Sequence, residues 1–156
     1  MQLFLLELAA RAFSAKKIPC FNGWPMLAWS VRAAQASGQF VEIMVSTEDL
    51  KIAEIAQACG AKVPFLCSVK NVDHYATTVH MLHAVLAQYS KVGRYFNLAF
   101  CLYPTAALAW PKDLSNGRAA LEAGDFHAFR PVAEFDNAIW RSLRRDKDGR
   151  ISMNFS

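Results

Sequence analysis

The stretch LFLLELA at residues 3–9 predicts a β-strand, because it is an apolar run of strand length that only Glu7 interrupts. A loop rich in turn residues follows and ends at Pro25, a residue suited to the first turn of a helix. Apolar residues then recur at helical spacing from Met26 up to Gly38, a typical C-terminal stop. The opening of the chain therefore predicts one strand-loop-helix unit.

The same alternation continues along the chain. Further strands are expected at Val41–Val45, Lys62–Leu66 and Asn97–Tyr103, and further helices at Leu50–Cys59, Thr77–Tyr89 and Pro111–Ala123. Ser46 or Thr47 is expected to cap the second helix. The buried face of the third helix is expected to carry Val79, Leu82, Val85, Leu86 and Tyr89. This order predicts an α/β fold, a Rossmann-like and mostly parallel sheet flanked by helices.

Two details complete the predicted fold. Asn97–Tyr103 is apolar almost throughout, so we expect a central strand that is covered on both faces. After an extended segment at Phe126–Phe135, Ile139–Leu143 pairs with Ile151–Phe155 through a turn at Asp148-Gly149. We expect this late β-hairpin to lie on the edge of the sheet, within a single domain over residues 1–156.

Composition restricts the class of protein. The 156 residues are 54% hydrophobic and 19% charged, which excludes a disordered chain, and the net charge of +4 permits an anionic ligand without requiring one. The four cysteines, at 20, 59, 67 and 101, form no CxxC pair and are expected to be reduced thiols of a cytoplasmic protein. No signal peptide and no membrane span is expected, since charged or polar residues interrupt every apolar run.

Ligands of such sheets bind beyond the carboxyl ends of the strands, so the loops after Ala9, Val45, Leu66 and Tyr103 form one candidate rim. The first of these loops carries two lysines, an arginine and a serine that could converge on phosphate: Arg11, Ser14, Lys16 and Lys17. The sequences GxxxxGK[ST] and GxGxxG are both absent, so the loop is not a P-loop or a dinucleotide fingerprint.

Two other groups of residues have alternative interpretations. His80 and His83 lie one helical turn apart, downstream of Asp73 and His74, and could hold a metal; two partly exposed histidines are the simpler interpretation. The basic residues of the late hairpin could contact nucleic acid, but Asp146 and Asp148 dilute their charge. We therefore expect no nucleic-acid partner.

An ordered set of short motifs runs along the chain: KKI at 16–18, FNGWPM at 21–26, AWS at 28–30, VSTED at 45–49, IAEIA at 52–56, GAKVPFL at 60–66, YPTA at 103–106, EF at 134–135 and DGR at 148–150, with Ile139, Arg141 and Leu143 between the last two. In order and spacing they resemble the motifs of the CMP-sugar synthetases, above all the pseudaminic acid and N-acylneuraminate cytidylyltransferases.

The resemblance implies transfer of CMP from CTP to a nonulosonic acid of the pseudaminic or sialic type, with release of pyrophosphate and with Mg²⁺ as cofactor. Lys16 and Arg11 match the cations that act on the phosphates and would be catalytic. The nucleotide-binding positions that it implies are Ala10, Arg11, Ser14, Lys17, Thr78, Tyr103 and Thr105. The implied partners are a nucleotide and an acidic sugar; the family forms homodimers through an arm that we expect to be absent from this chain.

The sequence departs from the family in its first loop. Ala12-Phe13 stands where the family has two glycines, and the loop is several residues shorter. Glycine permits a positive φ and a close backbone approach to phosphate, whereas another residue there costs about 1–2 kcal/mol. Carboxylates for Mg²⁺ are not visible either, and we expect a C-terminally truncated domain. The alternative is therefore a truncated or degenerate homologue that binds a nucleotide or a protein partner without catalysis.

Overall fold

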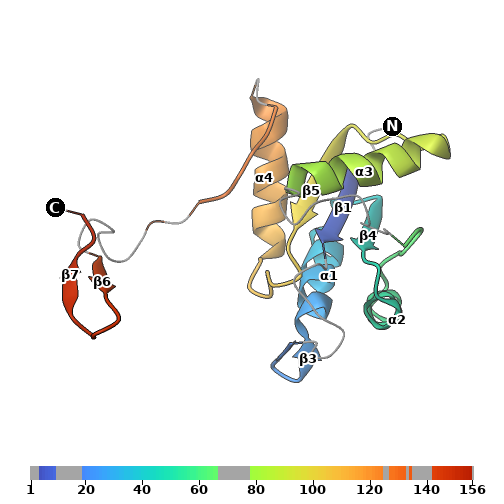
Figure 1. Ribbon diagram of the computed structural model, residues 1–156. Helices are drawn as coiled ribbons and strands as arrows, with labels where there is room; N and C mark the ends of the chain where they lie inside the picture. Colours follow the sequence, from blue (N-terminus) through green and yellow to red (C-terminus); the bar gives the residue numbers. More distant parts are fainter. Residues whose placement is uncertain are drawn as a thin grey trace.

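The computed structural model in Figure 1 describes residues 19–66, 78–124, 127–132, 134 and 142–155, together with the backbone of residues 4–9; at residue 78 only the backbone is described. Helices surround a small sheet, and a hairpin near the C-terminus lies apart from them. Among the described helices, none combines the length and the hydropathy that crossing a membrane requires.

The sheet contains β1 (Phe4–Ala9), β4 (Glu42–Ser46) and β5 (Leu98–Leu102). β1 lies between the other two and pairs in parallel with both. Asn97–Tyr103 is expected to form the central strand; within the described part of the chain β1 holds that place, and β5 pairs with β1 alone. A continuous apolar run indicates a strand whose faces are covered, and it contains no information about neighbouring strands.

The strand expected at Lys62–Leu66 is reduced to a single parallel bridge between Lys62 and Met44. The Lys62 amide donates to the Ile43 carbonyl at 2.8 Å, and its carbonyl accepts from the Val45 amide at 2.9 Å. Two residues later stands Pro64, where the next ladder donor would be. Because proline has no N–H, the ladder ends after one residue.

The first two helices follow their predicted bounds closely. α1 (Met26–Ser37) begins after Pro25 and ends at Gly38, which has a left-handed φ of 63°. α2 (Leu50–Ala58) is capped by Asp49, whose carboxylate accepts from the amides of residues 51 and 52. The prediction of Ser46 or Thr47 as the cap is therefore wrong. Asp49 directly precedes the helix and reaches its first unpaired amides, whereas the hydroxyl of residue 47 accepts from the Asp49 amide at 3.1 Å.

α3 (Thr78–Lys91) and α4 (Pro111–Ala123) also form where they were expected. The expected burial of Val79 is wrong, because its side chain is 55% exposed, and Met81, at 8%, lies on the buried face instead. Two residues turn an α-helix by about 200°, so Val79 and Met81 point in nearly opposite directions.

The two faces of the sheet pack against different helices, as alternate residues of β4 show. Val45 packs into a core with α1, α2 and α4, which also takes Phe100 of β5. Met44 packs into a second core with Val85 and Tyr89 of α3. Since successive side chains of a strand point to opposite faces, helices cover both faces of the parallel sheet.

Two hairpins complete the described fold. β2 (Cys20–Phe21) and β3 (Trp24–Pro25) pair through Asn22-Gly23, both with positive φ, inside a region that was expected to be a loop. A late hairpin forms around Asp148-Gly149, but its first strand is β6 (Leu143–Arg145) rather than the expected Ile139–Leu143, of which residues 139–141 lie outside the described part. With β7 (Ile151–Met153) it makes a separate sheet rather than an edge of the main one. Residues 127–132, part of the expected extended segment, have no regular secondary structure.

Candidate functional site

The strand order places the carboxyl ends of β1 and β5 side by side. From β1 the chain passes through α1 on one face of the sheet to β4, and it returns through α3 on the opposite face to β5. Ligands of α/β sheets bind beyond the carboxyl ends of the strands. The candidate site is therefore the rim formed by the chain that follows Ala9 and the chain that follows Leu102.

The basic segment follows β1 directly in the sequence. The register pairs Leu8 with Leu102 and Ala9 with Ser46, so β1 ends level with both neighbouring strands. The residues predicted for the phosphates begin directly after Ala9: Ala10, Arg11, Ser14, Lys16 and Lys17. All five lie outside the described residues, so their roles stay predictions.

The second side of the rim is a tight turn. The carbonyl of Tyr103 accepts from the amide of Ala106 at 2.9 Å, with Pro104 in the second position that proline favours. Pro104 is buried, whereas Tyr103 and Thr105 on either side of it are exposed. The two predicted nucleotide-binding residues of this segment therefore lie together, at the carboxyl end of β5.

α1 contacts this turn directly. The hydroxyl of Ser30 donates to the carbonyl of Tyr103 at 3.2 Å and reaches the carbonyl of Pro104 at 3.5 Å. Ser30 is fully buried. Ser30 has no predicted role; a lone serine within the buried apolar stripe of a helix is the signal that could have singled it out.

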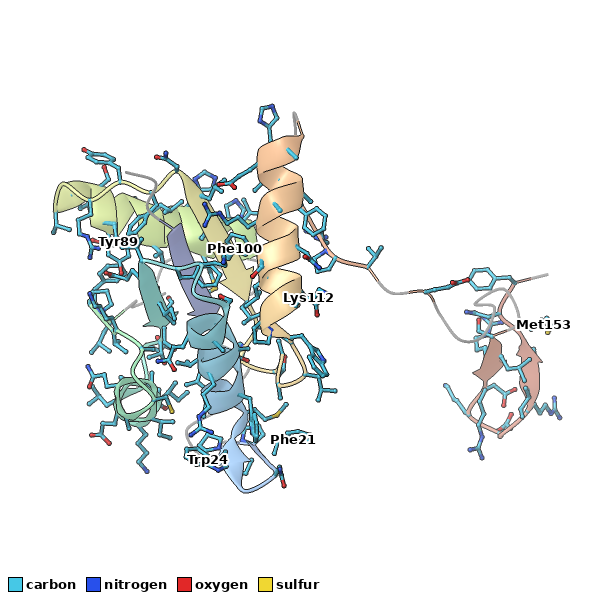
Figure 2. All side chains as sticks on the ribbon, turned by 180° about the vertical axis from the view of Figure 1, so that it is seen from behind. Phe21, Trp24, Tyr89, Phe100, Lys112 and Met153 are labelled. Carbon is cyan, nitrogen blue, oxygen red and sulfur yellow. The ribbon has the colours of Figure 1, made fainter. Side chains whose placement is uncertain are left out.

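Aromatic residues lie at the start of α1. The indole N–H of Trp29 donates to the carbonyl of Phe21 at 2.9 Å, and the guanidinium of Arg32 lies 4.0 Å from the ring centre of Trp24. Phe21 and Trp24 are 44% and 45% exposed. Figure 2 shows both near the start of α1, far from Tyr89 of α3.

Thr78 is the first residue of α3, which Figure 1 shows crossing the strands. Because its side chain lies outside the described part, its nucleotide role also stays a prediction. His80 and His83 of the alternative metal site are both exposed on α3. Within the described ranges no three His, Cys, Asp or Glu residues gather as a metal site would require.

The carboxylates near the rim do not form a set suited to Mg²⁺ within the described residues. Mg²⁺ is held through carboxylate oxygens, phosphates and water. Asp49 is the N-cap of α2, and Asp113 lies in the first turn of α4. Glu48 is exposed beside Asp49. The carboxylates of the described residues therefore do not fit Mg²⁺ at this site.

A family model and several similar proteins agree on the family of this chain. A family model described as cytidylyltransferase matches residues 11–130. A pseudaminic acid cytidylyltransferase of Campylobacter jejuni is 28% identical over 88% of this chain and 60% of its own length. A CMP-N,N'-diacetyllegionaminic acid synthase of Legionella pneumophila is 30% identical over 70% of this chain and 49% of its own length.

A solved structure shares the fold. The CMP:2-keto-3-deoxy-manno-octonic acid synthetase complexed with CTP superposes with a TM-score of 0.58 at 16% identity, over 78% of this chain and 47% of that chain. The chain thus spans about three fifths or less of the length of these proteins. Since the family model covers most of the chain, from Arg11 through the turn at Tyr103 and on to Arg130, this protein belongs to the cytidylyltransferase family.

Proposed function

We propose that this protein transfers CMP from CTP to a nonulosonic acid of the pseudaminic or sialic type and releases pyrophosphate. The names of the similar proteins support the reaction class, since two are a pseudaminic acid cytidylyltransferase and a legionaminic acid synthase. We also infer a Rossmann-like fold. The order of the Lys62 segment, β4, β1 and β5 supports this inference, because it matches the first four strands of that topology.

One observation carries the proposal: the strands that precede the basic segment and the Tyr103 turn are adjacent in the sheet. β1 and β5 pair in parallel along five residues, so their carboxyl ends lie side by side. A nucleotide placed there would have its phosphates near the chain after Ala9 and its base or sugar near Tyr103 and Thr105.

The chemistry requires charge neutralisation more than covalent catalysis. Attack of a sugar hydroxyl on the α-phosphate places negative charge on the phosphate oxygens, and positioned cations stabilise that charge. Arg11 and Lys16 are the proposed cations, with Lys16 at the α-phosphate. Ser14 and Lys17 would bind the remaining phosphate oxygens, Ala10 would offer its backbone, and Thr78 a hydroxyl to the nucleotide.

A second candidate function is nucleotide binding without turnover. The observation in its favour is Ala12-Phe13, which brings two side chains to a segment where the family has glycine.

We also propose a reducing, cytoplasmic compartment for this protein. The thiol state of Cys20, Cys59 and Cys101 supports this proposal.

The test combines calorimetry with CTP and a pyrophosphate-release assay with CTP, Mg²⁺ and pseudaminic acid. We expect micromolar binding and turnover, both lost in Lys16→Ala. Lys51→Ala is the matched control, because Lys51 is exposed on α2 outside the proposed site. Binding without turnover would favour the second candidate. No binding of CTP would refute both.

A further inference from the structure

The hydroxyl of Ser30 joins two elements that are far apart in the sequence. A serine inside a helix usually bonds to a carbonyl of its own preceding turn or faces solvent. Ser30 instead donates across to the Tyr103 carbonyl at 3.2 Å and lies 3.5 Å from the Pro104 carbonyl. It has no solvent exposure, so water cannot replace these contacts.

The turn that Ser30 contacts is fixed at its first residue. The Tyr103 carbonyl accepts from both the Ser30 hydroxyl and the Ala106 amide, and the Ala106 carbonyl accepts from the Ala109 amide at 3.1 Å in a second turn. Pro104, buried between them, has a restricted φ. The backbone from Tyr103 to Ala109 is therefore held from α1 on one side and by its own hydrogen bonds on the other.

We propose that Ser30 is a positioning residue for nucleotide binding. By anchoring the Tyr103 carbonyl to α1, it fixes the directions in which the exposed side chains of Tyr103 and Thr105 leave the turn, at the carboxyl end of β5. This inference rests on the proposed function, because it assigns CTP to the carboxyl ends of β1 and β5. Ser30 itself is buried behind the turn and acts through it.

Three variants separate this role from packing. Ser30→Ala removes the hydroxyl, and Ser30→Cys keeps nearly the same volume with a much weaker donor. Ser37→Ala is the control, because Ser37 lies in the same helix and its hydroxyl donates to the Ala34 carbonyl at 2.7 Å, at the end remote from the turn. Each protein is measured by amide hydrogen exchange and by calorimetry with CTP.

We expect faster exchange of the Ala106 amide and about five- to tenfold weaker CTP binding in Ser30→Ala and in Ser30→Cys, but not in Ser37→Ala. The proposal is overturned if the Ala106 amide exchanges at the same rate in all the proteins, or if Ser30→Cys binds CTP as the unsubstituted chain does. Failure of the unsubstituted chain to bind CTP would instead refute the proposed function, and the nucleotide role of Ser30 with it.

Discussion

The hydroxyl of Tyr89 donates a hydrogen bond of 2.5 Å to a carboxylate oxygen of Glu42, inside the core between α3 and the sheet. The other oxygen of Glu42 accepts from Arg94 at 2.7 Å and from Lys62 at 3.0 Å. Glu42 is the first residue of β4, so this cluster lies at the amino-terminal end of that strand, whereas the candidate site lies at the carboxyl ends of the strands. The cluster connects three parts of the chain to β4: α3 through Tyr89, the segment after α3 through Arg94, and the β-bridge through Lys62.

Stability should fall in acid because of Glu42. Burial alone would raise the pKa of Glu42, but the hydrogen bonds from Tyr89, Arg94 and Lys62 outweigh it, so the pKa lies below its ordinary value. The unfolded chain then binds this proton more readily than the folded protein. The contribution of Glu42 is therefore fully present above the unfolded-state pKa of about 4.3 and is lost as pH falls through the lower folded-state pKa.

Glu42→Gln tests this directly, with chemical unfolding measured between neutral and acidic pH. We expect a loss of about 1–3 kcal/mol at neutral pH, and a shallower decline in acid than that of the unsubstituted protein. Glu54→Gln, on the exposed face of α2, is the control and should retain the full decline. An equal pH dependence in the Glu42 variant and the unsubstituted protein would contradict the assignment.

Asp49→Ala should destabilise α2. The substitution removes the two hydrogen bonds that the carboxylate accepts, at 2.9 Å from Lys51 and 3.3 Å from Ile52, and leaves those amides without a cap. The expected cost is about 0.5–2 kcal/mol in the free energy of unfolding. Glu48→Ala removes a neighbouring exposed carboxylate that does not cap the helix and should change stability by less. Equal losses in the two variants would argue for a general charge effect.

The helices and parallel strands could be predicted because each depends on a local pattern. Pro25 and Gly38 bracket α1, and the apolar runs at 3–9 and 97–103 coincide with β1 and β5. Strand order could not be predicted, since an apolar run such as Leu98–Leu102 is the same in a central strand as at an edge. The β2–β3 hairpin had a local signal in Asn22-Gly23, a pair that favours positive φ and tight turns.

The candidate site was only partly accessible from the sequence. Tyr103 and Thr105 came from a motif, but their support by Ser30 spans 73 residues and depends on how α1 packs beside β5. The Glu42 cluster was missed for the same reason, because its partner Tyr89 is 47 residues away. Such contacts follow from tertiary packing, and neither periodicity nor turn chemistry encodes them.

Gly60→Ala should cost more than Gly38→Ala. Both glycines have positive φ, at 86° and 63°, so alanine is strained by about 1–2 kcal/mol at each. At Gly60 a Cβ would also lie 2.7 Å from the side-chain nitrogen of Gln35, which donates to the Cys59 carbonyl at 3.1 Å. Gln35 must move, and this hydrogen bond is then weakened. Thermal unfolding of both variants measures the difference, and equal midpoints would show that backbone strain alone decides the cost.

Tyr103→Ala should weaken CTP binding without a matching loss of stability. The side chain is 54% exposed at the carboxyl end of β5, so its removal takes away contact surface for a nucleotide more than it disturbs the core. A base stacked on or hydrogen-bonded to this ring would lose about 1–3 kcal/mol, which is roughly a 5- to 150-fold rise in Kd. Leu108→Ala is the matched control, because Leu108 is 76% exposed on the same connection but lies beyond the first turn. Calorimetry with CTP and thermal unfolding on both variants decide the matter. A similar change of Kd in both variants would contradict a specific contact between Tyr103 and the nucleotide.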